Sequence, residues 1–404
     1  MNEEEIKVYG YRWIVLLLFI LASMMVQIYW ITFGAITIEA QAYFGGIDEL
    51  YIFLLSAIFM IIYIPDTFLA SWLIDKYDFK IGCGTGVVLM AVFGFLRFIA
   101  GPNYTLMLIF TVFIGIGQPF IMNSITKLSA NWFPKSERTT ATGLGTISMF
   151  IGILLGMLLT PFLIVGTDLT PMLLIYGIAG LVIATLFVLF VKNRPPTPPS
   201  KDVIEERVLM FEGLRKMFTN KYFWILIIMY FLGLGIFNMI TTYIQVILTP
   251  KNPAFDATFA GIVGGIMLLG GIIGAIVFSA LADKFQKKVI FIIIAVILAT
   301  ASLYIFAFMN DATLIIIFAL LFGFGLLGAA PVALEYAVDI TKPVPEASSN
   351  GILMMVGQIG GILFILGLAD FKTPAGDYLP ALLLEAILLT IALVLTFFLK
   401  RVEK

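Results

Sequence analysis

The segment Ser71-Trp-Leu-Ile-Asp-Lys-Tyr77 returns 208 positions later (279 − 71) as Ser279-Ala-Leu-Ala-Asp-Lys-Phe285. Each copy ends an apolar segment, and each places a small residue four positions before an Asp-Lys pair. A second landmark, a polar loop led by proline and followed by glycine, recurs with the same spacing at Gly143 and Gly351 (351 − 143). Two landmarks with one offset predict that the chain is built from two copies of one design.

Composition restricts the class of protein. Hydrophobic residues make up 61% of the 404 residues, charged residues make up 12%, and the mean hydropathy is +1.08. One soluble core cannot bury so much apolar surface, so we expect a protein with many membrane-spanning segments. Histidine is absent and the one cysteine, Cys83, lies in an apolar stretch, so we expect no disulfide, metal site or cofactor, and any proton coupling must use carboxylates. The acidic segment Met1–Tyr9 lacks a cleavable-signal pattern, which predicts that the first apolar segment stays as an anchor.

Twelve apolar stretches are long enough to cross a bilayer, which takes roughly 20 helical residues. Helix is expected for each, because backbone amides in lipid must be hydrogen-bonded within the segment. The stretches are approximately Trp13–Ile38, Tyr51–Ile74, Ile81–Ala100, Tyr104–Leu128, Thr140–Val165, Met172–Val191, Phe223–Leu248, Thr258–Ala282, Val289–Met309, Thr313–Val338, Gly351–Leu368 and Tyr378–Leu399.

The basic residues favour one orientation. With the N-terminus in the cytoplasm, 21 of the 24 lysines and arginines fall on the inside, Lys251 and Lys372 fall outside, and Arg97 lies within a helix. This asymmetry follows the positive-inside rule. We therefore expect cytoplasmic termini, both Asp-Lys pairs on the cytoplasmic face and, from the compact loops, location in a prokaryotic cell membrane.

The predicted domains are a six-helix bundle over residues 1–192, a cytoplasmic linker over 193–220 and a second six-helix bundle over 221–404. The linker opens with four prolines between positions 195 and 199, which favour an extended chain. The following stretch, Asp202–Phe218, has apolar residues at helical spacing, which predicts a short amphipathic helix on the membrane surface. We interpret it as a tether between the bundles, with partner binding as the alternative.

Asp66 lies nine residues before the first Asp-Lys pair, roughly 13 Å along a helix, and so well inside the second stretch. A carboxylate held away from water favours its protonated form, so Asp66 is the candidate to bind and release a proton as water access alternates. The alternative is a structural carboxylate, hydrogen-bonded beside Pro65 or neutralised by a lysine or arginine.

Three further places carry charge within the apolar stretches, where charge is costly. Arg97 lies four residues before Gly101, so we expect it to reach the outer surface as an anchor, with contact to an anionic solute as the alternative. Glu335 and Asp339 are one helical turn apart and can pair with basic loop residues as a gate latch. Glu385 lies in the last stretch, where the sequence predicts no function for it.

The pairs Asp75-Lys76 and Asp283-Lys284 are interpreted as gate residues. The aspartates can accept hydrogen bonds at helix N-termini or pair with Arg138 and nearby lysines. Such contacts would hold the cytoplasmic side shut and would break on inward opening.

Polar side chains deep in the stretches indicate where a solute could bind. Trp30 lies well along the first stretch, Gln118 in the middle of the fourth, Asn238 in the middle of the seventh and Gln358 in the first half of the eleventh. For a single buried glutamine, a hydrogen bond between helices is sufficient explanation. Four such groups on four stretches favour a binding site.

Together these residues resemble a known family. The Ser-x-x-x-Asp-Lys pattern is similar to the turn that joins the second and third helices of each half in the major facilitator superfamily. The chain also resembles the feline leukaemia virus subgroup C receptor-related carriers within it, at Arg12-Trp13, Trp30-Ile31, Ser71–Lys76, Gly117-Gln118, Asn131–Phe133, Glu137–Thr142, Leu334–Asp339 and Gly357-Gln358.

The resemblance implies two parallel halves with the substrate bound at their interface near the bilayer midplane. That family includes choline and ethanolamine transporters and members described as haem exporters. Trp30, Gln118 and Gln358 match positions that surround the quaternary ammonium in the choline carriers, since an aromatic face attracts a cation and a glutamine oxygen accepts a hydroxyl proton. Asn238 stands where the family has an aromatic residue, which favours a primary amine or a more polar solute. Haem fits less well, because no histidine can ligate it.

We therefore predict an all-α membrane protein of twelve transmembrane helices, a monomeric carrier that moves a small polar or cationic metabolite by alternating access through Trp30, Gln118, Asn238 and Gln358. Transport is either facilitative or secondary active. The alternatives are a proton-coupled carrier of an organic anion that uses Arg97 and Asp66, and a non-transporting sensor on the same scaffold. No phosphate loop, metal cluster or nucleophile-base pair indicates an enzyme, and no feature indicates nucleic-acid binding.

Overall fold

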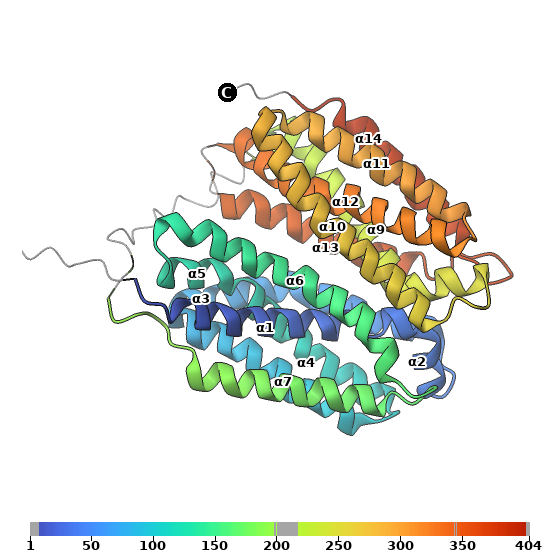
Figure 1. The fold of residues 1–404 in the computed structure, drawn as a ribbon, viewed down its shortest axis with the longest axis horizontal. Coiled ribbons are helices and arrows are strands. Elements are labelled where there is room, and N and C mark those ends of the chain that lie inside the picture. Colours follow the sequence, from blue (N-terminus) through green and yellow to red (C-terminus); the bar gives the residue numbers. More distant parts are fainter. Residues whose placement is uncertain (1–7, 198, 200–216, 343, 345, 401–404) are drawn as a thin grey trace, which may run out of the picture. The chain divides into compact units, whose positions relative to one another are not determined.

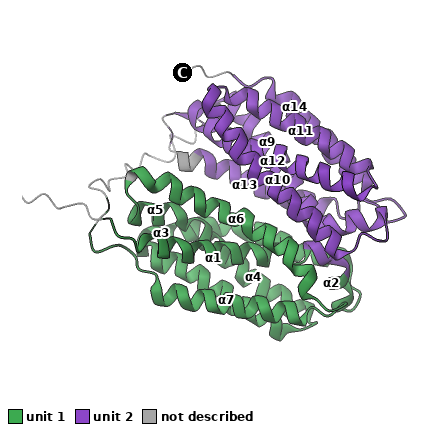
Figure 2. Cartoon of the chain, in the orientation of Figure 1, with its two compact units in different colours: residues 1–33, 39–205 green, residues 34–38, 206–404 purple. Residues whose placement is uncertain are grey.

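The computed structural model describes residues 8–197, 199, 217–342, 344 and 346–400. The described residues are helical apart from loops and one isolated bridge between Val165 and Asp168. The chain divides into two compact units (Figure 2), of which unit 1 holds residues 1–33 and 39–205 and unit 2 holds residues 34–38 and 206–404. The linker predicted at 193–220 contains this division. Most of the amphipathic helix predicted for Asp202–Phe218 lies outside the described residues.

Unit 1 is a bundle of helices (Figure 1). They are α1 (Arg12–Ile31), α2 (Thr37–Tyr43), α3 (Glu49–Ala100), α4 (Tyr104–Met122), α5 (Ser124–Trp132), α6 (Lys135–Leu163) and α7 (Thr170–Phe190). The short 3-10 turn η1 (Gly34–Ile36), which follows α1, and the first two residues of α2 belong to unit 2.

Unit 2 repeats the arrangement in the second half of the chain. Its elements are α9 (Lys221–Leu248), η2 (Thr249–Lys251), α10 (Ala257–Phe285), α11 (Lys288–Phe308), α12 (Ala312–Thr341), α13 (Glu346–Gly367) and α14 (Leu379–Thr396).

Short polar residues set the start of five long helices. The side chains of Asp48, Asn103, Asn220, Asp256 and Asp311 each accept a hydrogen bond from a backbone N–H of the first helical turn. Such caps satisfy donors that have no partner within the helix. They fix the first turn of these five helices.

Eleven helices of the described residues are long and apolar enough to span a membrane, against twelve predicted stretches. The difference is α3, a run of 52 residues that contains the second and third stretches. Asp78 interrupts it with φ 69° and ψ 175°, so α3 comprises two spanning segments joined at one residue. The first predicted stretch also differs, because α1 ends at Ile31 instead of Ile38. The fourth is divided at Asn123 into α4 and α5.

The two units pair their helices in the same way. In unit 1, α1 packs on α6, and α3 packs on both α4 and α7. In unit 2 the corresponding pairs are α9 with α13, α10 with α12, and α11 with α14. The backbone repeats as well, since Asp78 and Gln286 are the non-glycine residues with positive φ in the described chain, and they are 208 positions apart (286 − 78). The offset seen in the sequence is therefore a structural repeat.

Glycine allows close contact between α10 and α12. A Cβ added at Gly274 would collide with the carbonyl oxygen of Phe324, and one at Gly323 would collide with that of Met267. The backbones of the two helices touch at these points, which a larger side chain would prevent.

Candidate functional site

Trp30 and Gln118 are both buried in unit 1. Trp30 lies in the last turn of α1 with 5% of its surface exposed, and Gln118 lies on α4 with 7% exposed. Nε2 of Gln118 donates to Oε1 of Gln27 on α1 at 3.4 Å. The helix-to-helix hydrogen bond considered for a lone glutamine is thus present, and Gln27 is a polar neighbour that the sequence interpretation missed. The sequence did contain a signal for Gln27, because its amide side chain lies in the interior of the first apolar stretch.

Asn238 and Gln358 lie on α9 and α13, which pack together in unit 2. Asn238 is 6% exposed, and Gln358 is half-buried. Among the described residues, neither side-chain amide has a hydrogen-bond partner, which leaves its donors and acceptor available. Asn238 follows Trp30 by 208 positions (238 − 30), so the two occupy the same place in the repeat.

Arg97 differs from the expectation. It is 1% exposed, so the prediction that it reaches the outer surface is wrong. Its Nε and Nη2 donate to Oγ1 of Thr111 on α4 at 3.2 and 2.8 Å, and its Nη1 donates to the carbonyl oxygen of Tyr29 on α1 at 3.2 Å. Helix packing encloses the guanidinium before its side chain can reach the surface.

Asp66 is half-buried on α3. One carboxylate oxygen, Oδ2, is inaccessible and has no hydrogen-bond partner, and no ion pair to Asp66 is formed within the described part of the chain. Neighbouring polar residues are satisfied, because Nδ2 of Asn123 donates to Oγ1 of Thr67 at 2.9 Å and to Oγ of Ser71 at 3.2 Å. The sequence predicted neutralisation of Asp66 by a lysine or arginine as one alternative, and the described residues show no such ion pair.

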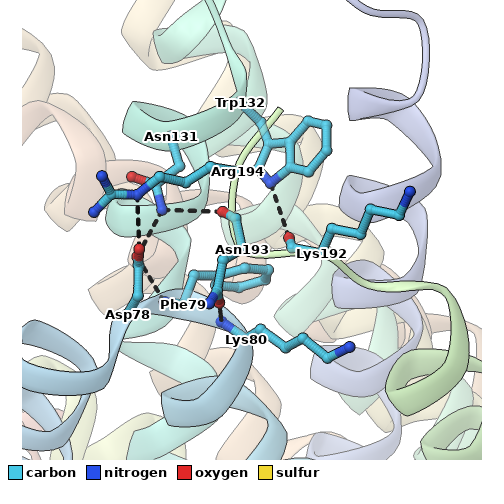
Figure 3. A network of polar contacts seen from close by, with 8 residues as sticks. All are labelled: Asp78, Phe79, Lys80, Asn131, Trp132, Lys192, Asn193 and Arg194. Carbon is cyan, nitrogen blue, oxygen red and sulfur yellow. Dashed lines mark hydrogen bonds and ion pairs between the residues drawn. The ribbon is translucent and has the colours of Figure 1, made fainter. Parts of the chain in front are cut away.

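The turn after the first Asp-Lys pair carries a polar network (Figure 3). Oδ1 of Asp78 accepts from Nδ2 of Asn131 at 2.8 Å and from the backbone N–H of Phe79 at 2.9 Å. Oδ2 of Asp78 pairs with Nε of Arg194 at 2.7 Å. Next to it, Oδ1 of Asn193 accepts from the backbone N–H of Lys80 at 2.6 Å. The network fixes the chain that leaves α7 to the break in α3.

The predicted gate aspartates are not in that network. Asp75 and Asp283 are exposed, and neither forms an ion pair in the described structure. Arg138, the predicted partner of Asp75, donates to the backbone oxygens of Ala130 and Phe133 at 3.2 Å each. The hydrogen bonds are made instead by Asp78, three residues beyond Asp75, where the backbone has a positive φ.

Both lysines of the Asp-Lys pairs are exposed as well. Nζ of Lys76 lies 4.7 Å from the ring centroid of Trp72 and 5.0 Å from that of Tyr77. Lys284 lies 5.6 Å from the ring of Phe285. These are contacts within one helix and do not join helices.

The predicted pairing of Glu335 and Asp339 with basic residues is confirmed. Nζ of Lys288 lies 3.1 Å from Glu335 and 2.8 Å from Asp339, and Lys342 lies 3.1 Å from Asp339. Lys288 and Asp339 follow Lys80 and Asn131 of the first unit by 208 positions each (288 − 80 and 339 − 131). Each unit therefore joins its third and fourth spanning segments by polar contacts at the same end.

Glu385 is fully buried on α14, and both of its carboxylate oxygens lack hydrogen-bond partners among the described residues. The part of the chain that the structure describes contains no cluster of three metal-ligating side chains.

Repeated bundles of helices that are long and apolar enough to span a membrane indicate a multi-pass membrane protein. The family model of the Major Facilitator Superfamily matches residues 15–365 and 251–404, and the chain belongs to this superfamily. It is a transporter of small metabolites and not an enzyme.

Relatives with near full-length similarity include transporters with named substrates. The chain is 28% identical to solute carrier family 49 member A3 of Xenopus tropicalis over 90% of this chain and 78% of that protein. It is 25% identical to the choline/ethanolamine transporter FLVCR2 of Homo sapiens, over 98% and 78%, and 27% identical to the choline/ethanolamine transporter FLVCR1 of Felis catus, over 91% and 69%.

Solved structures share the fold. A bacterial homolog of the human lysosomal transporter Spinster, in an inward-facing and unoccupied conformation, matches with a TM-score of 0.78 at 14% identity, over 97% of this chain and 98% of that one. The nucleoside transporter NupG matches with a TM-score of 0.72 at 16% identity, over 97% and 98%.

Proposed function

We propose that this carrier transports a small amine of the choline and ethanolamine type. The observation that carries the proposal is the buried Trp30 on α1, three residues after Gln27, whose side chain accepts a hydrogen bond from Gln118. An indole face attracts an organic cation, and amide oxygens accept protons from its hydroxyl or ammonium group. The relatives named as choline/ethanolamine transporters support the same cargo class.

We propose substrate-binding residues in each unit, taken by itself. Unit 1 provides Trp30 and Gln118, and unit 2 provides Asn238 and Gln358, whose amides have no partner of their own. Because an amide replaces an aromatic ring at Asn238, the site should bind a primary ammonium group, which can donate hydrogen bonds, in preference to a trimethylammonium group, which cannot.

Uptake into proteoliposomes tests the cargo. Trp30→Ala should reduce uptake of labelled ethanolamine at least tenfold, whereas Trp13→Ala, on the same helix but 42% exposed, should leave uptake unchanged. Asn238→Trp should shift the choline-to-ethanolamine preference towards choline by roughly fivefold, the effect of about 1 kcal/mol of cation–π attraction. If Trp30→Ala leaves the uptake of every amine intact, the assignment is wrong.

Proton coupling is proposed for Asp66, because its carboxylate has an inaccessible oxygen without a partner. In Asp66→Asn proteoliposomes, substrate flux should no longer respond to an imposed pH gradient, while exchange of labelled for unlabelled substrate should continue. A flux that responds to the gradient as in the wild type would leave Asp66 with a structural role only.

We also propose that the protein is a monomer in the cell membrane and that both of its termini lie in the cytoplasm. Gate roles are proposed for seven residues, Asp75, Lys76, Arg138, Asp283, Lys284, Glu335 and Asp339. The one native cysteine, Cys83, is buried, so introduced cysteines can report topology. On intact cells, an impermeant thiol reagent should label Lys372→Cys and should not label Asp283→Cys. The opposite pattern would reverse the orientation.

A further inference from the structure

The end of α1 is held by side chains instead of by a continuing helix. The last four carbonyl groups of a helix have no intrahelical donor. Here the oxygen of Ile28 accepts from Oγ1 of Thr32 at 2.7 Å, that of Tyr29 from Nη1 of Arg97 at 3.2 Å, and that of Trp30 from Oγ of Ser56 at 3.3 Å. Three consecutive carbonyls at Trp30 are therefore satisfied, two of them by residues of α3.

Arg97 is a buried cation without a carboxylate partner among the described residues. Its guanidinium carbon lies 5.5 Å from the ring of Tyr29 and 5.7 Å from that of Phe33. These ring faces and the negative end of the α1 dipole provide the favourable field that a buried cation needs. Because neutral groups of the protein already surround it, Arg97 is placed to hold α1 and not to receive an anionic solute.

The side chain of Tyr29 is also held in place, by contacts with α7 and with two glycines. The hydroxyl of Tyr29 donates to the carbonyl oxygen of Tyr176 on α7 at 2.8 Å. Its ring occupies space left by two glycines, since a Cβ at Gly94 or Gly180 would collide with the Tyr29 hydroxyl. The residue directly before Trp30 is thus anchored through its side chain to α7 and through its carbonyl to α3.

We infer that Arg97 is a positioning residue for transport, which fixes the last turn of α1 and thereby the indole of Trp30. The inference depends on the proposed function, because it assigns Trp30 to the cargo. The planar guanidinium bridges Thr111 and Tyr29 with three fixed donors, a geometry that a lysine ammonium does not reproduce. Arg97→Lys should therefore behave more like Arg97→Gln than like the wild type.

The test uses full-length protein in which the other four tryptophans are replaced by phenylalanine, so that Trp30 is the only tryptophan and its emission can be excited selectively. Arg97→Gln should increase acrylamide quenching of Trp30 at least twofold and raise the half-saturating ethanolamine concentration roughly tenfold. The matched control is Lys251→Gln, because Lys251 also donates to helix-terminal carbonyls, those of Phe306, Ala307 and Met309 at 2.5 to 3.3 Å, but does so in unit 2. It should change neither quantity.

A double-mutant cycle separates positioning from stability. If Arg97 acts through Trp30, Arg97→Gln should reduce uptake by no more than twofold when Trp30 is already phenylalanine. Additive losses, or unchanged quenching with a lower melting temperature, would overturn the inference. If Arg97→Gln does not fold, Thr111→Val removes the same anchor and should give the same pattern in weaker form. If no amine binds the parent protein but Arg97→Gln still increases quenching, the cargo assignment fails and the positioning of Trp30 stands.

Discussion

Replacing Asp78 by alanine and by glycine separates backbone strain from side-chain bonding at the break in α3. Its φ of 69° and ψ of 175° fall in a region populated almost entirely by glycine. Its carboxylate nevertheless accepts three hydrogen bonds, from Phe79, Asn131 and Arg194. Alanine removes the bonds and keeps the strain, whereas glycine removes both.

The two effects differ in size. Bonds from Asn131 and Phe79 to a charged acceptor contribute about 1.5 kcal/mol each at the lower end of their range. Arg194 has a side chain that is 64% exposed and adds little. Asp78→Ala should therefore lose about 3 kcal/mol of unfolding free energy. Glycine recovers about 2 kcal/mol of strain, so Asp78→Gly should lose only about 1 kcal/mol.

The free energy of unfolding can be measured by titrating detergent-solubilised protein with a denaturing detergent and following tryptophan fluorescence. Gln286 is the matched control, because it also has positive φ and lies 208 residues later, but its exposed side chain makes one local bond, to the carbonyl oxygen of Asp283 at 2.6 Å. Its replacement by glycine should change stability by less than about 0.5 kcal/mol. An Asp78→Ala variant as stable as Asp78→Gly would refute the reasoning.

Three further changes test other parts of the structure by the same measurement. Lys288→Met leaves Asp339 without its closest cation and should cost about 2 kcal/mol, and a stability equal to the wild type would show that the pair is screened. Gly323→Ala forces a methyl group onto a facing backbone and should cost at least about 2 kcal/mol, whereas Gly351→Ala, with open space around it, should gain up to about 1 kcal/mol; equal effects would contradict the packing argument. Glu385→Leu removes a buried carboxyl without partners and should stabilise by about 1 to 3 kcal/mol, so a destabilised variant would indicate a bonding partner for Glu385.

Hydropathy predicted the spanning segments well but not their interruptions. The apolar run continues from Trp13 to Ile38, yet α1 ends at Ile31, because side chains of α3 complete the bonding at that point. Of the three donors only Thr32 is local, whereas Ser56 and Arg97 are distant in sequence, so the residues around the end of α1 do not reveal these bonds. The same limit applies to the predicted gate residues, because the motif pointed to Asp75 and the hydrogen bonds are made by Asp78.

Composition and the repeated motif were enough to predict the class of protein, the internal repeat and the approximate spans. An apolar chain in lipid must satisfy its backbone within helices, so composition alone restricts the fold, and a shared offset of 208 residues needs no coordinates. The contacts of the polar residues, in contrast, depend on how the helices pack. Arg97 would carry the same charge on any helix. Here the packed helices bury it, and its guanidinium binds Thr111 and the carbonyl oxygen of Tyr29 instead of reaching the surface. Contacts between helices depend on packing, which the order of residues along one helix does not reveal.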